Sequence, residues 1–484
     1  MIKPVLLWTD AAIWLLMAGL ALYCFGLRRQ ATQAATWGRV LRDPVGVAAG
    51  ALLALFLLVT LADSVHYRVA LDAGPAGQTV YDTHARSLLD ALMQRQLAMR
   101  ETSYSAPLAW RGFSREASGD VGMLPGQAVA RAFPRLAFGG AALADPARDW
   151  AGDVVRRALW GLFGGALAAA LLFAAIAARL AATHGGWRLA ARDLAADRTV
   201  HPLRALWLTL ACVCLLLGPT LALMPAYHVL GTDRTGNDVL YQSLKSVRTA
   251  FVIGALSTLA TLPFALGLGV LAGYFRGWID DAIQYLYTLL ASVPNVLLIA
   301  ACVLMVQVFL DQNPQLFETA AERGDLKMFL LCAVLGITGW SGLCRLVRAE
   351  TLKLRELDYV QAATAFGVSP WRIMRRHIVP NLMHLVLITA VLNFSDLILY
   401  EAVLTYVGVG VDPTTTSFGG MINLARLEMS RDPLVWWSFA AAFGFMVALV
   451  LAANLFADAV RDAFDPRARA QRPWHRRHKA VPPC

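Results

Sequence analysis

Nine long apolar segments divide this chain, and they restrict it to folds that a lipid bilayer can hold. Each is long enough to cross about 30 Å of hydrocarbon as a helix. They lie near residues 5–27, 45–62, 158–181, 205–224, 249–273, 282–310, 328–345, 385–408 and 435–457. With 58% hydrophobic and only 16% charged residues, a water-soluble chain would expose large apolar patches. The sequence therefore predicts an all-α, polytopic membrane protein with about nine transmembrane helices.

Basic residues indicate how these helices are oriented. The chain has a net charge of +10, and outside the long polar segment 63–157 its Lys and Arg side chains gather in the short loops 28–44, 179–204 and 347–384 and in the tail after 457. When nine spans alternate, all four segments fall on one side, which the positive-inside rule makes cytoplasmic. We therefore expect the N-terminus outside and the C-terminus in the cytoplasm. The first apolar run is too long for a signal peptide and lacks a cleavage pattern, so we expect a retained helix.

The segment Tyr359–Asn381 has the pattern of a short helix, a turn and a second short helix between two spans. Ala362, Ala363 and Phe366 would give the first helix a small, flat apolar face. Gly367 suits the residue that follows the end of a helix. Such a loop would project from the membrane as a rigid knob.

The second short helix has its own start and stop signals. Ser369 can cap it, with Pro370 at its first position, and Pro380 would stop it before the next span. Between them lies a basic run, Arg372, Arg375, Arg376 and His377.

This segment resembles the "EAA" coupling loop of ABC importer permeases, and most closely the C-type permease of the dipeptide/oligopeptide family. The resemblance rests on the alanine pair, Gly367 and the closing Ile378-x-Pro380, whereas Gln361 replaces the usual Glu. In that family the loop docks into a cleft of a cytoplasmic ATPase. The resemblance thus implies an ATPase-coupling loop made of Gln361, Ala362, Ala363, Phe366, Gly367, Ile378 and Pro380.

Three further blocks resemble the same family, and together the four cover about 229–469. The first, GTDRTGNDVLYQSLKSVRTAFVIG from Gly231, would form an amphipathic helix at the outer membrane surface, with Val239, Leu240 and Leu244 on its apolar face. The second is EAVLTYVGVGVDPTTTSFGGMI from Glu401, whose glycines would end a membrane helix or allow close helix contact. The third is ADAVRDAFDPRAR (457–469). Residues of these blocks that could line a substrate path or a gate are Asp233, Asp238, Arg248 and Glu401, to which we add Asp396.

These blocks divide the chain into five regions. Two spans (1–62) precede an extracytoplasmic insertion (63–157), two further spans (158–228), a permease core of the ABC importer type I kind (229–469, with the coupling loop at 347–384) and a basic cytoplasmic tail (470–484). Either 45–62 or 205–224 could be the first span of the core, and we favour 45–62. The insertion has a Gly/Pro cluster at Gly74–Gly77 and an amphipathic helical run near Arg86–Arg100. It is interpreted as a family-specific decoration or as a contact surface for a binding protein.

The sequence contains neither an ATPase motif nor either of two common enzyme motifs. A P-loop requires Gly-Lys, and no lysine here follows a glycine. HExxH and Gly-x-Ser-x-Gly are also absent, and His475 and His478 are interpreted as part of a solvated basic tail rather than a metal site. We therefore expect no enzyme activity, no metal and no cofactor bound by this chain, with ATP and Mg on partner ATPases.

The resemblance implies an importer of peptides or similar small solutes in a bacterial inner membrane. Its expected partners are a second permease subunit of the B type, two ABC ATPase subunits, an extracytoplasmic substrate-binding protein and membrane lipid. No nucleic-acid partner is expected, because no motif that reads RNA or DNA accompanies the positive charge. The alternative is an ion- or proton-coupled secondary transporter, because Asp396 and Glu401 are ionisable residues in or near a span.

Overall fold

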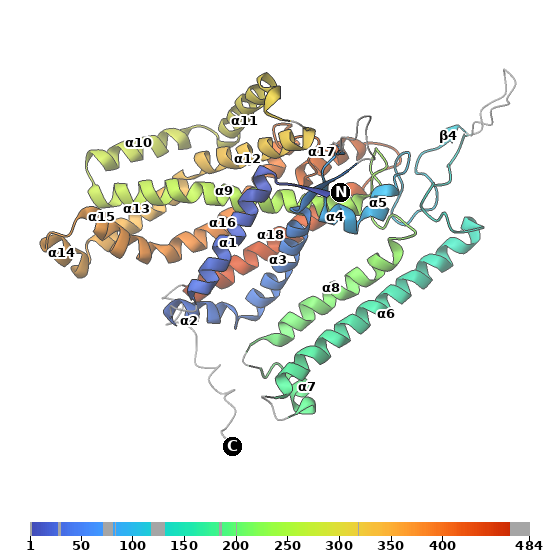
Figure 1. Ribbon diagram of the computed structural model, residues 1–484, viewed down its shortest axis with the longest axis horizontal. Coiled ribbons are helices and arrows are strands. Elements are labelled where there is room, and N and C mark those ends of the chain that lie inside the picture. The colour runs from blue at the N-terminus through green and yellow to red at the C-terminus, as the bar shows by residue number, and fades with distance from the viewer. Residues whose placement is uncertain are drawn as a thin grey trace.

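The computed structural model describes residues 2–27, 31–70, 81–82, 84–117, 131–182, 186–199, 201–317 and 319–464. Within them the fold is an elongated helical bundle with two small sheets (Figure 1). The helices are α1 (Trp8–Leu27), α2 (Ala31–Val40), α3 (Pro44–Asp63), α4 (Leu88–Leu92), α5 (Gln94–Ala98), α6 (Pro146–Ala181), α7 (Trp187–Ala195), α8 (Leu203–Leu223), α9 (Val239–Phe275), α10 (Trp278–Ser292), α11 (Asn295–Gln312), α12 (Ala320–Gly339), α13 (Ser341–Arg355), α14 (Asp358–Ala365), α15 (Pro370–Ile373), α16 (Val379–Tyr406), α17 (Phe418–Glu428) and α18 (Trp437–Phe464), with a 3₁₀ turn η1 (Pro314–Leu316) and a π-helical segment η2 (Met374–Ile378). The strands are β1 (Ile2–Val5), β2 (His66–Val69), β3 (Arg86–Ser87), β4 (Glu116–Ala117) and β5 (Arg131–Ala132).

Eight of the described helices are long and apolar enough to cross a membrane. A ninth span results if α12 and α13, which are bent by 43° at Trp340, are counted together. The prediction of an all-α polytopic protein with about nine spans is thereby confirmed.

One predicted span is wrong as a single helix. The run 282–310 is broken into α10 and α11 at Val293 and Pro294. Val293 has an extended backbone (φ −92°, ψ 134°), as expected for the residue before a proline, whose ring disfavours the helical conformation of its neighbour. Apolar composition alone did not reveal this break.

The long helix α9 forms the centre of the bundle. It packs against α3, α12, α13 and α16, and at 37 residues it is about 55 Å long. The predicted surface-lying helix around Val239 and Leu240 is wrong: these residues are buried in the first turn of α9, which continues without a break into the span. The helix starts there because the Asp238 side chain accepts a hydrogen bond from the backbone N–H of Tyr241.

Of the two candidates for the first span of the core, α3 is the one that packs on α9 and α18. Helix α8 instead pairs with α6, and this hairpin leans away from the bundle (Figure 1). The pairing is close because glycines face each other: a Cβ at Gly161 would lie 2.5 Å from the carbonyl oxygen of Gly218. The structure therefore favours the span at 45–62.

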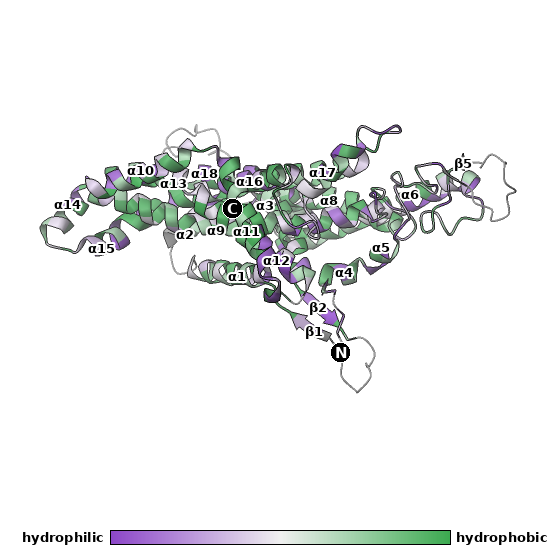
Figure 2. Ribbon diagram, turned by 90° about the horizontal axis from the view of Figure 1, so that it is seen from above, coloured by the Kyte–Doolittle hydropathy of each residue, from purple (hydrophilic) through white to green (hydrophobic). Residues whose placement is uncertain are grey.

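The insertion and the N-terminus are joined by a small sheet. Strand β1 pairs antiparallel with β2, with Ile2 opposite Val69, and β2 pairs with β3. Figure 2 shows hydrophilic colouring on β2 and apolar colouring over much of the long helices. The predicted amphipathic run at Arg86–Arg100 is not one helix but β3 followed by α4 and α5, which are separated at Met93.

Several predicted features lie outside the described residues. They are Arg28 and Arg29, the cluster at Gly74–Gly77, the end of the block 457–469 from residue 465 onward, and the tail with His475 and His478.

Candidate functional site

The predicted coupling loop forms the end of the bundle farthest from the small sheet (Figures 1 and 2). Helix α14 ends at Ala365, and Gly367 follows in the left-handed conformation (φ +73°) that suits a residue after a helix. Ser369 then precedes α15, with Pro370 at its first position. The Ser369 side chain makes no capping hydrogen bond to this short helix. The predicted helix–turn–helix is confirmed.

The loop exposes a small apolar surface on a buried base. Phe366 is 87% exposed, and Ala362 beside it is also exposed. Ala363, which was predicted to share their face, packs instead against the buried cluster around Val360. Exposed Gln361 donates a hydrogen bond to the backbone carbonyl of Glu356 at 3.1 Å. The surface that protrudes is therefore narrower than the sequence predicts.

Pro380 does not stop the helix, which corrects the prediction. The chain from Pro370 to Tyr406 is one long helix in which η2 is a π-helical segment. Here the N–H of Val379 reaches the carbonyl of Met374, five residues back, and Pro380 follows at once within the first turn of α16. A proline is tolerated where the hydrogen-bond register changes, because its missing N–H falls at the start of the new register. Ile378 is fully buried beneath the loop.

The opposite end of the bundle holds the GTD segment. Asp233 accepts hydrogen bonds from the backbone N–H groups of Thr235 and Asn237, at 2.8 and 2.9 Å. Gly236 has φ +77°, and its backbone touches that of Glu101 in the insertion. The insertion is thus folded directly onto this turn.

A buried group of charged side chains stabilises the contact between the insertion and the GTD segment. His228 Nδ1 donates to Asp238 Oδ2 at 2.8 Å, and His228 Nε2 lies 3.7 Å from Glu101 Oε1. Burial by itself lowers the pKa of His228, but the Asp238 and Glu101 carboxylates outweigh it and raise the pKa to about 9. Burial raises the pKa of Glu101, whereas His228 and three backbone N–H donors (Ala137, Phe138 and Gly139) lower it to about 2. Both groups are therefore charged at neutral pH.

Arg248 lies in a second buried group, between α9, α1 and α12. Its Nη2 donates to Asp10 Oδ1 at 2.6 Å and to Thr9 Oγ1 at 2.9 Å, and it lies 3.7 Å from Asp325 Oδ1. Asp10 also shares a hydrogen bond with His66 Nδ1 at 2.7 Å. Arg248 thus joins the N-terminal helix to the core.

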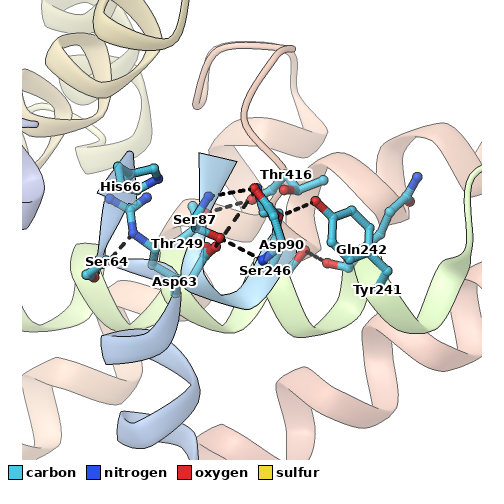
Figure 3. A network of polar contacts seen from close by, with 12 residues as sticks. Asp63, Ser64, His66, Ser87, Asp90, Tyr241, Gln242, Ser246, Thr249 and Thr416 are labelled. Carbon is cyan, nitrogen blue, oxygen red and sulfur yellow. Dashed lines mark hydrogen bonds and ion pairs between the residues drawn. The ribbon is translucent and has the colours of Figure 1, made fainter. Parts of the chain in front are cut away.

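The neighbouring polar contacts continue along α9 (Figure 3). Ser87 donates to Asp63 at 2.6 Å, and Tyr241 donates to Asp90 at 2.6 Å. Lys245 lies 3.0 Å from Asp90 and 3.9 Å from Asp63. Of the predicted gating residues, Asp233, Asp238 and Arg248 thus all lie at this polar end, inside protein contacts.

The two intramembrane carboxylates do not meet. Asp396 and Asn393 line a hollow of about 170 Å³ together with Thr261, Asn295 and Tyr400. Glu401 is fully buried elsewhere and accepts a hydrogen bond from Thr405 at 2.8 Å. Gly410 and Gly419 press against the same Thr405, as the close-contact prediction requires. In the described part of the chain, no group of three His, Cys, Asp or Glu side chains is placed to hold a metal ion.

The sequence of the chain is similar to those of known membrane proteins. The family described as "Binding-protein-dependent transport system inner membrane component" matches residues 265–470. The oligopeptide transport system permease protein OppC of Mycobacterium tuberculosis is 32% identical over 245 residues, which cover 51% of this chain and 78% of the relative. The chain belongs to this family. OppC of Haemophilus influenzae is 30% identical (51% and 72% covered), and the glutathione transport system permease protein GsiD of Pectobacterium atrosepticum is 30% identical (50% and 74%). A solved chain of the MetNI methionine ABC transporter, in an inward-facing form, is 17% identical and has a TM-score of 0.35. The match covers 47% of this chain and 96% of the solved chain, and it is too weak to carry an argument.

As a member of this family, the chain is a multi-pass inner-membrane permease of an ABC importer. The comparisons give no support to the ion-coupled carrier. Residues 265–470 include the coupling loop and every lining residue of the Asp396 hollow except Thr261, but not the insertion or the α6–α8 hairpin. Sequence reasoning missed Asp10, His66, Asp90 and Asp325. Each belongs to a polar group assembled from distant parts of the chain, and no local pattern marks it.

Proposed function

We propose that this chain is the C-type membrane subunit of an ATP-driven importer of peptides or similar small solutes. Its partners in this proposal are a B-type permease, two ABC ATPases and an extracytoplasmic binding protein. The N-terminus and the insertion 63–157 lie outside, and the C-terminus lies in the cytoplasm. ATP and Mg are held by the ATPases, and the chain itself binds no cofactor.

The main support for this proposal is the exposed end of the coupling loop, the knob, where Phe366 protrudes. A Phe side chain that is 87% exposed is costly to leave in water, and a partner's cleft would remove it from water. The base of the knob is stiff, because Val360, Ile373 and Ile378 are buried against α9 and α13. A push on Phe366 would therefore move these helices rather than bend the loop.

Two arginines of α13 connect the base of the coupling loop to α9 and α10. Arg348 of α13 binds Asp280 of α10 through two hydrogen bonds, at 2.5 and 2.7 Å. Arg355 Nη1 donates to the carbonyl of Tyr274 near the end of α9 at 2.7 Å. Closure of the ATPase dimer would thus be transmitted to α9 and α10. The hollow beside Asp396 lies farther along, against α9, α11, α12 and α16, and it is our candidate for part of the substrate path.

The test is co-purification of the tagged chain with its ATPases and uptake of a labelled peptide. Phe366→Ala should lose both, because it removes the exposed side chain without touching the buried base. The control, Leu427→Ala, removes an equally apolar and 61% exposed side chain at the opposite end and should keep the ATPases bound. If Phe366→Ala retains the ATPases as the unaltered chain does, the docking role is refuted.

A further inference from the structure

An apolar groove runs along the surface next to the coupling loop. It has a volume of about 310 Å³, and its walls are nearly all apolar. One wall comes from α9 and the other from the second helix of the coupling loop (α15 and η2) and the first residue of α16. Together they consist of Pro263, Leu266, Gly267, Val270, Leu271, Trp371, Met374, Arg375 and Val379.

The floor of the groove is open because of a glycine. Pro263, Gly267 and Leu271 follow one another at intervals of four residues, so they share one face of α9. A Cβ added at Gly267 would meet no atom within 4 Å. Gly267 therefore leaves room for a ligand, whereas other bundle glycines such as Gly269 press against neighbouring helices.

Three arginines stand at one end of this groove. Arg372, Arg375 and Arg376 are exposed and, with Pro380, line an adjoining hollow of about 410 Å³. Arg375 belongs to both the groove and the hollow. Within the described residues none of the three has an ion pair, whereas Arg276 and Arg348 nearby are paired with Glu356 and Asp280. Crowded cations without acidic partners favour an anion.

We propose that an anionic phospholipid binds here, with an acyl chain in the groove and its phosphate on the three arginines. Guanidinium groups bind phosphate through paired hydrogen bonds. Basic pockets between membrane helices at the cytoplasmic face suit anionic headgroups. Trp371, which lines the groove and is 70% exposed, is the kind of side chain that sits at headgroup level. An apolar helix of another subunit would fill the groove but leave the guanidinium groups unpaired.

The π-helical segment explains how the two parts of the site come together. In an ordinary α-helix successive residues turn by about 100°, and the wider turn of η2 shifts Arg375 and Arg376 relative to Val379. The lipid would thus bridge α9 and the helix that carries the coupling loop. Its placement in the cytoplasmic leaflet rests on the proposed function, whereas the binding itself does not.

The test uses the purified full-length chain in phosphatidylcholine nanodiscs with or without phosphatidylglycerol, extracted into mild detergent for native mass spectrometry. The unaltered chain should retain phosphatidylglycerol and not phosphatidylcholine. The triple variant Arg372→Gln, Arg375→Gln, Arg376→Gln should retain at least tenfold less. The matched control Arg188→Gln, Arg192→Gln, Arg198→Gln removes three exposed arginines elsewhere and should retain the lipid.

A second variant tests the apolar part of the site. Gly267→Leu adds a side chain whose Cβ meets no atom within 4 Å, so it should occupy the groove and reduce retention while elution and thermal stability stay unchanged. Equal retention by the two triple variants would overturn the proposal, and so would equal retention of phosphatidylcholine. Displacement of the lipid by the co-expressed partner permease would also overturn it, in favour of a subunit interface. Because the ATPases are absent from these assays, loss of ATPase docking would leave the result unaffected.

Discussion

Arg248→Met would leave the carboxylates of Asp10 and Asp325 without the cation that lies between them. The side chain of Arg248 is only 8% exposed, so the buried carboxylates cannot recover solvation from water. Breaking one partner of a buried ion pair typically costs about 3–5 kcal/mol of unfolding free energy. Lys245→Met, one turn earlier on α9, removes a cation that is 23% exposed and should cost less. A direct role in substrate binding would instead abolish uptake and leave stability unchanged.

The assay is a double-mutant cycle on the free energy of unfolding in detergent. It compares Arg248→Met, Asp10→Asn and the double variant. Because the two charged groups are 2.6 Å apart, we expect a coupling energy of at least about 1.5 kcal/mol, so the double variant should be more stable than additivity predicts. Additivity within about 0.5 kcal/mol would refute the interpretation that Arg248 fastens α1 to the core.

Three further predictions concern other contacts. Gly165→Leu should separate α6 from α8, because its side chain would meet the carbonyl oxygen of Cys214, and crosslinking between cysteines placed on the two helices should fall. The pKa of His228 is raised from 6.5 to about 9, so its stabilising effect of about 3 kcal/mol should be complete below pH 6.5 and lost as the pH rises through 9. Thermal unfolding from pH 6 to 10 should show this loss, and His228→Gln should remove it. Gly367→Asp should abolish uptake but not membrane insertion, since the residue has free space around it but lies at the turn that we propose docks into the ATPase, and normal uptake would count against docking.

The sequence predicted the features that depend on neighbouring residues. Apolar runs located the spans, and Gly367 with Pro370 located the turn of the coupling loop, because backbone preferences act within a few residues. The break at Pro294 was missed because the surrounding composition is as apolar as that of an unbroken span. Pro380 was misinterpreted for a related reason: whether a proline ends a helix depends on the hydrogen-bond register before it, which η2 changes.

The buried polar contacts around Arg248 could not be predicted in the same way. Arg248 was selected as a gating candidate, but its partners Thr9 and Asp10 come from the first helix of the chain. Nothing in the local pattern of either segment specifies the other. The pairing exists because tertiary packing brings α1 against α9 and α12, and buried charges are then stable only in pairs.

The contacts of α1 also bear on the order in which the protein is made. Arg248 lies 238 residues after Asp10, and Asp325 lies 316 residues after Thr9. At bacterial synthesis rates of roughly 5–20 residues per second, Asp10 leaves the ribosome about 10–50 s before Arg248. During that interval the first helix enters the membrane with a carboxylate whose cation has not been made. Helix α1 is therefore expected to take its final place only after α12 has been inserted, so that a segment synthesised before the core is assembled after much of it.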